Sequence, residues 1–335
     1  MPHCLIVAEA GVNHENDPGR AEDYVRAAAA CGADAVKFQT YRADSIATKS
    51  AAPYWDSHEG QHVTFSRLDK LPWNYYRELV RLGEELGIVV FSTPFDLEAV
   101  DMLDEAGVKW FKIASADLTY HRLIEKVASK GKPVILSTGA STRAEVYFAA
   151  CVLGQGKHTL LHCTLKYPCP PEAIHLRKMV QLKSDYCDWT VGLSDHSLGT
   201  AISVAAAALG AGMIEKHFTL SKDTPGASPD HWLSADRKEL TRIVSEVRIV
   251  EQALGDVQKA PDPLEADAIR YARRSVTSAV HIPANTEITP EMLTCKRPGW
   301  GIPATEEHVT AGRIARVFIP ADTTMTPDML WGRKC

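Results

Sequence analysis

The chain has 335 residues, of which 45% are hydrophobic and 24% charged, and its formal net charge is -5. This composition is ordinary for a globular protein, and the slight acidity disfavours a nucleic-acid-binding protein, which is usually strongly basic. No apolar run reaches the ~20 residues that span a bilayer, and the first residues lack the basic and apolar segments of a signal peptide. The eight cysteines form no Cys-x-x-Cys pair, which favours reduced thiols. We therefore expect a soluble cytoplasmic protein that binds neither nucleic acid nor membrane.

Short apolar segments alternate with amphipathic segments from residue 5 to about residue 254. The apolar segments predict strands at Leu5–Ala10, Ala35–Gln39, Val89–Thr93, Trp110–Ala114, Val134–Thr138, Thr159–Cys163, Thr190–Leu193 and Met213–Phe218. The amphipathic segments predict helices between them, for example at Arg20–Cys31, Trp73–Leu86, Leu97–Glu105, His121–Lys130 and Gly199–Leu209. Eight such units in about 250 residues indicate a closed parallel (β/α)8 barrel, the TIM barrel. An open doubly wound sheet is the alternative, but the turn after the first strand lacks its glycine-rich phosphate motif.

Two stretches interrupt this alternation. Residues 41–71 are long for a strand-to-helix loop, and in a barrel such a loop would lie on the catalytic face. Its inner part, Tyr54–Leu71, contains Trp55, His58 and His62 and is expected to shape an acceptor pocket. The second interruption, around Pro261-Asp262-Pro263, predicts a linker. We therefore expect a catalytic barrel over residues 1–255, a linker over 256–272 and a small β-rich domain over 273–335.

The predicted C-terminal domain contains an internal repeat. Residues 282–293 and 319–330 both begin with Ile-Pro-Ala, continue with a polar turn and Thr-Pro, and end with Met-Leu. Strands are predicted nearby at Ser275–Ile282 and Arg313–Ile319. The repeat indicates a strand, a turn and a short helix used twice, with pseudo-twofold symmetry.

Polar side chains stand at the end of every predicted barrel strand, where barrel enzymes carry their catalytic groups. These residues are Glu9, Asn13, His14, Lys37, Gln39, Ser92, Thr93, Lys112, Ser115, Asp117, Ser137, Thr138, His162, Thr164, Ser194, Asp195, His196, Glu215, Lys216 and His217. Ionisable groups are costly to bury unless they are paired or bound to something. Their recurrence at all eight strand ends therefore predicts an enzyme.

The basic members of this set suggest an anionic substrate. Lys37, Lys112 and Lys216, with hydroxyl groups between them, would suit a phosphate or a carboxylate. Each lysine could instead pair with a barrel carboxylate such as Glu9 or Glu215. A Schiff-base lysine is a further possibility that spacing alone leaves open.

Two histidines end neighbouring predicted strands. The imidazoles of His196 and His217 could therefore meet at one metal ion, for which Mn, Zn or Fe(II) would be suitable. Asp195 and the Asp230-His231 pair lie near them in the sequence, so His231 is a further candidate for the site. His162 could equally pack in the rim of the barrel.

Several of these segments together resemble the sialic acid synthase family, whose members make sialic, legionaminic or pseudaminic acids. The resemblance rests on Glu9-Ala10-Gly11-Val12-Asn13-His14, Lys37-Phe38-Gln39, Ser92-Thr93-Pro94-Phe95-Asp96, Lys112-Ile113-Ala114-Ser115, His162-Cys163-Thr164, Gly192-Leu193-Ser194-Asp195-His196 and Glu215-Lys216-His217-Phe218-Thr219. The C-terminal domain is similar to that family's antifreeze-like (SAF) domain, including Lys296-Arg297-Pro298-Gly299. The motifs extend over almost the whole chain and follow the family's order.

The resemblance implies condensation of phosphoenolpyruvate with an amino-sugar aldehyde, giving a nonulosonic acid and phosphate. By this resemblance His196 and His217 would hold a divalent metal, Mn2+ or Mg2+, and Glu9 would position or deprotonate the attacking water. Phosphoenolpyruvate would be bound by Lys37, Thr93, Lys112, Ser115, Ser137 and Ser194. The sugar would be bound by Gln39, Asp117, Tyr167, Asp230 and Arg297. Arg297 would come from the partner in a domain-swapped homodimer.

The sequence departs from the family's pattern at four places. Leu165 stands where many members carry Asn or Ser, and Asp117 stands where sialate-making members often carry Glu. Glu15 replaces a common Asn or Gly, and the loop at residues 225–230 is two residues longer than usual. The first departure concerns the phosphate pocket, and the others concern the identity of the sugar. A condensing enzyme with a different sugar acceptor is therefore one alternative.

Two alternative functions lie outside this reaction class. A Schiff-base aldolase would use Lys112 or Lys216, and it would be trapped by borohydride and insensitive to chelators. An ice- or carbohydrate-binding protein built around the C-terminal domain is the non-enzymatic alternative. The polar strand ends argue against it, because a binding scaffold does not need them.

Overall fold

A computed structural model describes residues 3–54, 59–223 and 228–333. The chain divides into two compact units, residues 1–255 and 256–335. The first unit contains the strand–helix alternation and the second contains the internal repeat. Each unit is described by itself.

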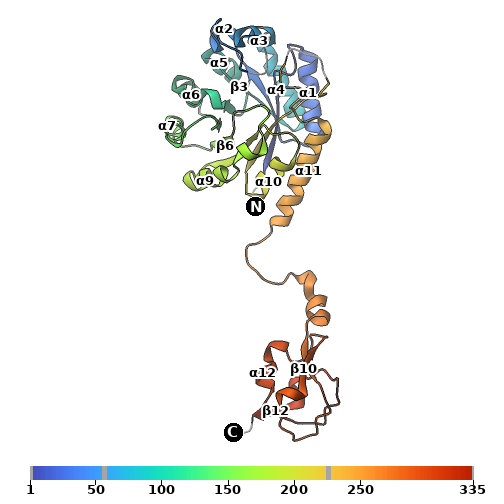
Figure 1. Ribbon diagram of the computed structural model, residues 1–335. Coiled ribbons are helices and arrows are strands. Elements are labelled where there is room, and N and C mark those ends of the chain that lie inside the picture. The colour runs from blue at the N-terminus through green and yellow to red at the C-terminus, as the bar shows by residue number, and fades with distance from the viewer. Residues whose placement is uncertain (1–2, 55–58, 224–227, 334–335) are drawn as a thin grey trace. The chain divides into compact units, whose positions relative to one another are not determined.

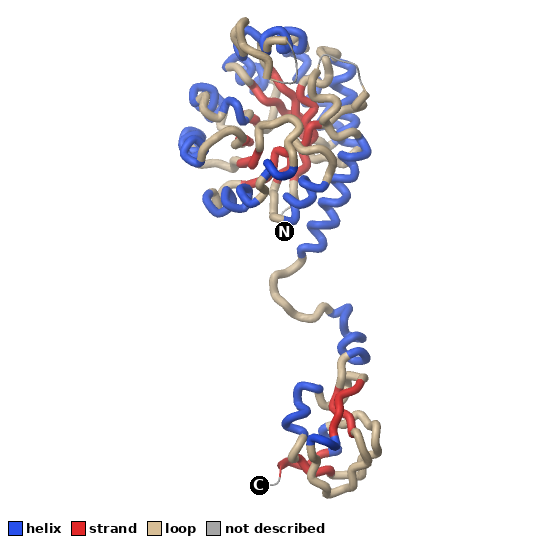
Figure 2. The backbone as a smooth tube through the Cα atoms, viewed as in Figure 1, coloured by secondary structure: helices blue, strands red, loops and turns tan. Residues whose placement is uncertain are grey.

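The eight strands of the first unit form a closed parallel barrel in which every strand pairs with its neighbour in the sequence and β1 pairs with β8. The strands are β1 (Leu5–Gly11), β2 (Ala35–Thr40), β3 (Val89–Pro94), β4 (Phe111–Ile113), β5 (Val134–Ser137), β6 (Thr159–Cys163), β7 (Thr190–Asp195) and β8 (Met213–His217). Figure 2 shows the strands of this unit inside a ring of helices. The predicted (β/α)8 barrel is confirmed.

The barrel strands are almost completely buried, as expected for parallel strands covered by helices on the outside. Closure aligns the C-terminal ends of the strands, so that Glu9 of β1 lies opposite His217 of β8. β7 runs to Asp195, two residues beyond its predicted end, because Ser194 and Asp195 pair with Glu215 and Lys216 of β8. Tertiary pairing therefore extends a strand into polar residues.

The helices of the first unit cover the barrel (Figure 1). They are α1 (Pro18–Ala30), α2 (Ala43–Ile46), α3 (Gln61–Leu68), α4 (Tyr76–Leu86), α5 (Leu97–Glu105), α6 (His121–Ala128), α7 (Arg143–Leu153), α8 (Pro171–Ile174), α9 (Arg177–Asp185), α10 (Ala201–Ala208) and α11 (Arg237–Leu254). Short 3₁₀ helices occupy Trp73–Tyr75 and Ser115–Asp117. None of the helices in the described ranges is long and apolar enough to cross a membrane.

Local capping explains where several helices begin. Asp17 accepts a hydrogen bond from the Arg20 amide before Pro18, the first residue of α1. Reciprocal capping boxes start α7 and α11, through Thr142 with Glu145 and Asp236 with Glu239. The predicted helix Trp73–Leu86 is divided, because its first turn is a 3₁₀ helix and α4 begins at Tyr76.

The long segment between β2 and β3 contains structure of its own. α2 and α3 lie within it, and they contribute to a small apolar cluster. Val12, Tyr41 and Leu68 are the buried members of this cluster, and Ile46, Phe65 and Phe95 pack against them. Trp55 and His58, which were expected to shape a pocket here, lie outside the described residues. The described parts of this segment thus place apolar side chains at the catalytic face of the barrel.

The second unit consists of two antiparallel two-stranded sheets with short helical turns. Its strands are β9 (Ser275–Ser278), β10 (Leu293–Lys296), β11 (Arg313–Ala315) and β12 (Leu330–Arg333), and its α-helix is α12 (Glu307–Thr310). A π-helix spans Ala268–Ala272, and 3₁₀ helices span Pro263–Glu265, Pro290–Met292, Ala304–Glu306 and Pro327–Met329. β9 and β11 are shorter than the strands predicted at Ser275–Ile282 and Arg313–Ile319.

The two repeat copies contact each other in this unit. The amide of Ile282 donates to the carbonyl of Ile319 at 2.8 Å, and the amide of Ile319 donates back at 2.9 Å. Asn285 and Asp322 occupy equivalent turns, and both have a left-handed backbone with φ near 60°. Reciprocal contacts between equivalent residues are what a pseudo-twofold axis requires.

Candidate active site

A pocket of about 410 Å³ opens at the C-terminal ends of the barrel strands. Every barrel residue to which the resemblance gives a role lines it, namely Glu9, Lys37, Gln39, Thr93, Lys112, Ser115, Asp117, Ser137, Tyr167, Ser194, His196, His217 and Asp230. Arg297 belongs to the second unit, where it is exposed. Residues from all eight strands or the loops that follow them therefore meet at one place, as barrel closure requires.

Two buried lysines lie among carboxylates in the pocket. Lys37 Nζ lies 2.6 Å from Glu9 Oε2 and donates a hydrogen bond to Thr93 Oγ1 at 2.9 Å. Lys112 Nζ donates to Glu215 Oε1 at 3.0 Å, and Lys37 Nζ is 3.9 Å from Glu215 Oε2. The site thus holds two ammonium groups that an anionic substrate could bind in place of the carboxylates.

The two carboxylates differ in their electrostatic environments. Burial raises the pKa of Glu9, and the charge of Glu215 adds to this effect against the opposing Lys37 ammonium. Burial also opposes ionisation of Glu215, but the charges of Lys112 and Lys37 outweigh it and lower its pKa. Glu215 is therefore the permanent counter-ion of the lysines, whereas Glu9 is suited to exchange a proton.

The hydroxyl groups of Ser115, Ser137 and Ser194, together with that of Thr93, complete this part of the pocket. Ser194 donates to Glu215 Oε1 at 3.0 Å, and Ser115 Oγ accepts from the Gly139 amide at 2.9 Å. The buried hydroxyl of Ser137 has no hydrogen-bond partner among the described residues. A buried polar atom without a partner is costly, so this hydroxyl is well placed to bind a substrate oxygen.

The two histidines lie side by side with Tyr167. The ring centroids of His196 and His217 are 5.5 Å apart, and the Tyr167 ring lies 4.1 Å from His196 and 5.7 Å from His217. His196 Nδ1 is 2.9 Å from the carbonyl oxygen of Thr164, which requires a proton on Nδ1, so that in the neutral ring Nε2 carries the lone pair. Burial lowers the pKa of His217 well below its usual range and favours the neutral ring.

These residues fit a divalent metal ion. A metal-binding histidine commonly donates its second ring nitrogen to a carbonyl, as His196 does. His217 Nδ1 is buried, has no hydrogen-bond partner among the residues that the structure describes, and lies 3.7 Å from Asp230 Oδ2. Within the described ranges no three His, Cys, Asp or Glu side chains form a ready-made metal centre. The protein would therefore contribute the two imidazoles and leave the remaining positions to substrate or water.

Lys216 does not join the other two lysines, so the expectation that all three converge is wrong. Successive side chains of a strand point to opposite faces, and Glu215 and His217 face the pocket. Lys216 faces outward, where it donates to Asp195 Oδ2 at 2.9 Å and to the Ser197 carbonyl. Asp195 also accepts from Ser203 at 2.7 Å. This buried ion pair joins β7 to β8 behind the pocket.

Other polar strand-end residues also point away from the pocket. Ser92 bonds to Thr40, Thr138 donates to the Leu161 carbonyl, and His162 Nε2 contacts the Ile174 carbonyl at 2.6 Å. His231, a further candidate for the site, contacts Thr219 Oγ1 at 2.9 Å and does not line the pocket. The alternation of side chains along the strands separates Ser92, Thr138 and His162 from the pocket.

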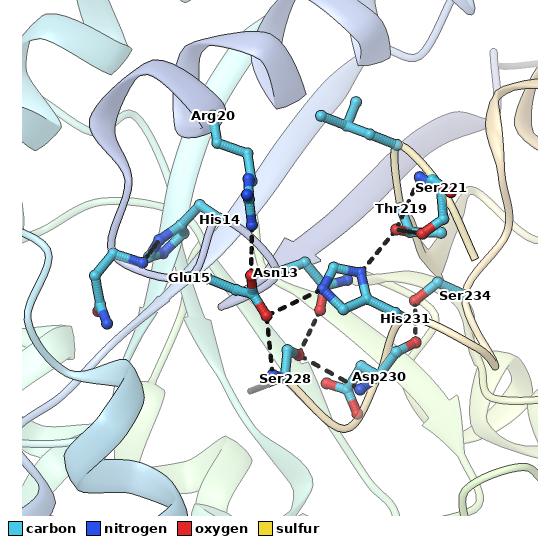
Figure 3. Close-up of polar contacts among 12 residues, drawn as sticks. Asn13, His14, Glu15, Arg20, Thr219, Ser221, Ser228, Asp230, His231 and Ser234 are labelled. Carbon is cyan, nitrogen blue, oxygen red and sulfur yellow. Dashed lines mark hydrogen bonds and ion pairs between the residues drawn. The ribbon is translucent and has the colours of Figure 1, made fainter. Parts of the chain in front are cut away.

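The loop after β8 is tied to the loop after β1 by the polar network in Figure 3. Ser228 Oγ donates to Asn13 Oδ1 at 2.5 Å and accepts from the Asp230 amide at 3.4 Å. His231 Nε2 lies 3.6 Å from Glu15 Oε1, and Glu15 is paired with Arg20. The Asp230 carbonyl accepts from Ser234 at 2.6 Å. These contacts fix the backbone that carries Asp230 into the pocket.

Burial of the Asp117 carboxyl group should destabilise the folded protein, to an extent that depends on pH. Its Oδ2 has no hydrogen-bond partner in the described structure, and burial raises its pKa from 3.8 to about 7. Between these values the folded protein retains a proton that the unfolded chain releases, so this group makes stability fall as pH rises from about 4 to 7. We expect Asp117→Asn to stabilise the protein at pH 8 by on the order of 2 kcal/mol, and to do so far less at pH 4.

Urea unfolding of both proteins at the two pH values measures this difference. Asp188→Asn is the matched control, because Asp188 is exposed. An equal effect of Asp117→Asn at pH 4 and pH 8 would contradict a buried, unpaired carboxyl group.

Several pocket residues are absent from the predicted site. Glu215 was named among the polar strand-end residues and as a counter-ion but was given no role in the site, although its position two residues before His217 places it on the same face of β8. Cys163 lines the pocket, with its Sγ 3.8 Å from His196 Nδ1. An apolar wall also lines it, made of Tyr41, Ile46, Tyr54, Phe65, Phe95 and Leu165. Strand alternation could have identified Glu215 and Cys163. The segment Tyr54–Leu71 was expected to shape a pocket, and its Tyr54 and Phe65 lie in the wall, but no local pattern assigned the other wall residues.

A (β/α)8 barrel with a charged pocket at the C-terminal ends of its strands is the architecture of an enzyme. Residues 24–259 match the NeuB family, and residues 273–330 match the SAF domain. The chain therefore belongs to the NeuB family and carries a C-terminal SAF domain, which confirms the resemblance seen in the sequence motifs.

Individual relatives are similar over most of their length. The N,N'-diacetyllegionaminic acid synthase of Campylobacter jejuni is 40% identical over 94% of this chain and 96% of its own. The N-acetylneuraminate-9-phosphate synthase of Homo sapiens is 37% identical over 88% of this chain and 83% of its own. The crystal structure of N-acetylneuraminic acid (sialic acid) synthetase from Leptospira borgpetersenii, in complex with citrate, has a TM-score of 0.72 and 32% identity, over 80% of this chain and 90% of that one.

Proposed function

We propose that this protein condenses phosphoenolpyruvate with an N-acylated hexosamine aldehyde to give a nonulosonic acid and phosphate. One observation carries the proposal: two buried lysines and four hydroxyls gather opposite a histidine pair in one pocket. The lysines and hydroxyls suit the phosphate and carboxylate of phosphoenolpyruvate. The names of the relatives in Campylobacter jejuni and Homo sapiens, both synthases of acids of this class, support the same reaction.

The reaction proceeds by addition to the open-chain aldehyde. C3 of phosphoenolpyruvate attacks the aldehyde carbon, and the positive charge left at C2 is quenched by water. The resulting tetrahedral hemiketal phosphate loses phosphate by C–O cleavage. Glu9 takes the proton from the water, since its raised pKa suits a base working near neutral pH. Lys37 and Lys112 neutralise the phosphate and carboxylate throughout.

His196 and His217 are proposed to hold a divalent metal ion, Mn2+ or Mg2+. When bound, such an ion acts as a Lewis acid that polarises the aldehyde oxygen. The charges in the pocket support this assignment, because four carboxyl groups and only two lysines line it among the described residues. An anionic substrate entering that set requires further positive charge.

We further propose a homodimer in which the SAF domain of one subunit covers the barrel of the other. Gln39, Asp117, Tyr167 and Asp230 would contact the sugar from their own barrel, and Arg297 would reach it from the other subunit. The division of the chain into two compact units and the exposure of Arg297 are compatible with this exchange. Neither chain would then have a complete site alone.

Phosphate release from phosphoenolpyruvate with a panel of hexosamines tests the reaction. The panel contains N-acetylmannosamine, its 6-phosphate and a 2,4-diacetamido-2,4,6-trideoxyhexose, each with Mn2+ and with EDTA. We expect release with one sugar, its loss in EDTA, and its recovery when Mn2+ is restored. Calorimetric titration of Mn2+ should show at least ~10-fold weaker binding to His217→Ala, with His308→Ala as the control from the second unit. Release that survives EDTA would contradict the roles given to the histidines.

A further inference from the structure

One side of the pocket is an apolar wall formed largely by the long segment between β2 and β3. The Tyr41 ring lies 5.2 Å from that of Phe65 and 5.8 Å from that of Phe95, both in edge-to-face contact. Tyr41 is buried in the small cluster with Val12 and Leu68, against which Ile46 also packs. Because these side chains pack against one another, the wall is a preformed apolar surface for a substrate.

The wall continues across the pocket to the loop after β6. The Tyr54 hydroxyl donates to the carbonyl oxygen of Leu165 at 3.2 Å, which joins two segments 111 residues apart. Leu165 itself lines the pocket and is only partly buried. Gln61, a polar neighbour of the wall, donates its side-chain amide to the Ala52 carbonyl at 2.8 Å. The wall therefore favours methyl groups over hydroxyl groups.

The basic and the acidic side chains of the pocket suit different substrates. Lys37 and Lys112 are the only Lys or Arg side chains among the described lining residues, and both contact Glu9 or Glu215. The other charged lining residues are the carboxylic acids Asp117 and Asp230. Carboxylates accept hydrogen bonds from N–H or O–H groups and repel phosphate. Once phosphoenolpyruvate occupies the lysines, the described lining residues of the barrel offer a second phosphate carboxyl groups and no further lysine or arginine.

We propose that the acceptor is an uncharged, unphosphorylated deoxyhexosamine that places its N-acyl and deoxy methyl groups against the wall of Tyr41, Ile46, Tyr54, Phe65, Phe95 and Leu165. An N–H or O–H group of this sugar donates to Asp117. The inference rests on the proposed condensation and selects one acceptor class for it. The similarity to relatives does not distinguish between the acceptor classes, since the N,N'-diacetyllegionaminic acid synthase and the N-acetylneuraminate-9-phosphate synthase have similar identities to this chain, 40% and 37%.

The test compares kcat/KM for three acceptors at saturating phosphoenolpyruvate with Mn2+. The acceptors are the 2,4-diacetamido-2,4,6-trideoxyhexose of manno configuration, N-acetylmannosamine and N-acetylmannosamine 6-phosphate. We expect the trideoxy sugar to exceed N-acetylmannosamine by at least ~10-fold, because one buried methyl group is worth about 10- to 200-fold in discrimination. The 6-phosphate is expected to be the poorest substrate.

Variants of the wall test whether it sets this preference. Leu165→Asn should reduce the ratio of trideoxy sugar to N-acetylmannosamine by about 10-fold, whereas Leu86→Asn, exposed at the end of α4, should leave it unchanged. Phe65→Tyr adds one hydroxyl to the wall with little change in shape and should also reduce the ratio, so the test remains valid if Leu165→Asn fails to fold.

The outcomes separate this inference from the proposed function. If the 6-phosphate is the best acceptor, or if both wall variants keep the parent ratio, the inference is wrong while the condensation stands. If no acceptor releases phosphate from the folded protein, the condensation itself is wrong, and the inference falls with it.

Discussion

We expect the Glu9→Gln variant to bind phosphoenolpyruvate but to turn over about 10²- to 10⁴-fold more slowly than the parent protein. Glutamine keeps the shape of the side chain, and its single amide oxygen can accept from Lys37 or from Gln39, which lie 2.6 Å and 3.0 Å from the two Glu9 oxygens. It cannot accept the proton of the attacking water. Steady-state phosphate release measures kcat, and fluorescence or calorimetric titration measures the affinity for phosphoenolpyruvate.

The pH profile distinguishes a base from a positioning group. Glu9 must be ionised to act, so kcat should rise with pH through its raised pKa, and Glu9→Gln should lack this acid limb. Glu125→Gln, at an exposed position in α6, is the matched control and should keep the parent profile. A Glu9→Gln enzyme with near-parent kcat would rule out the proposed role of Glu9.

The second large effect is expected from Lys112→Met. This change removes the 3.0 Å partner of Glu215 and leaves that carboxylate with Lys37 at 3.9 Å and Ser194 at 3.0 Å. Breaking a buried ion pair from one side costs about 3–5 kcal/mol, so urea unfolding should show a large loss of stability. The KM for phosphoenolpyruvate should rise about 10- to 100-fold, because a charge-assisted hydrogen bond is worth about 1.5–3 kcal/mol.

Lys109→Met is the matched control, because Lys109 is exposed and its partner Glu84 is too. Lys112 also tests the aldolase alternative, which named Lys112 or Lys216 as the Schiff-base lysine, because Lys216 is not among the described residues that line the pocket. We expect borohydride to trap no adduct in the presence of substrate. An adduct that disappears in Lys112→Met would replace the proposed condensation with Schiff-base chemistry.

The barrel and most of the pocket could be predicted because both depend on local patterns. A buried strand needs a run of apolar residues, so an ionisable residue at its end is visible in the sequence. Glu9, Lys37 and His217 were found in this way, and all three line the pocket. The prediction failed for Lys216, because it treated every polar residue at a strand end alike. Because side chains alternate along a strand, Lys216 points to the outside of the barrel and pairs there with Asp195.

The apolar wall was predicted only in part, because the segment Tyr54–Leu71 was expected to shape a pocket but its partners elsewhere in the chain were not identified. Tyr54 and Leu165 are 111 residues apart, and the packing of Tyr41 on Phe65 and Phe95 depends on the fold of a long inserted segment. Periodicity describes which face of an element is buried, but it does not state which distant segment covers that face. The network that holds Asp230 likewise joins Asn13 to Ser228 across the closure of the barrel.

The sequence by itself determined the fold class, the repeated C-terminal domain and the presence of a polar site at the strand ends, because strand periodicity, turn motifs and costly buried charges are all local signals. Only the tertiary structure decided which charges face one another and what surrounds the acceptor. Barrel closure brings β1 beside β8, so that Glu9 lies opposite His217. Those relations depend on long-range packing, in which each contact is chosen by the shape and charge of residues far away in the chain.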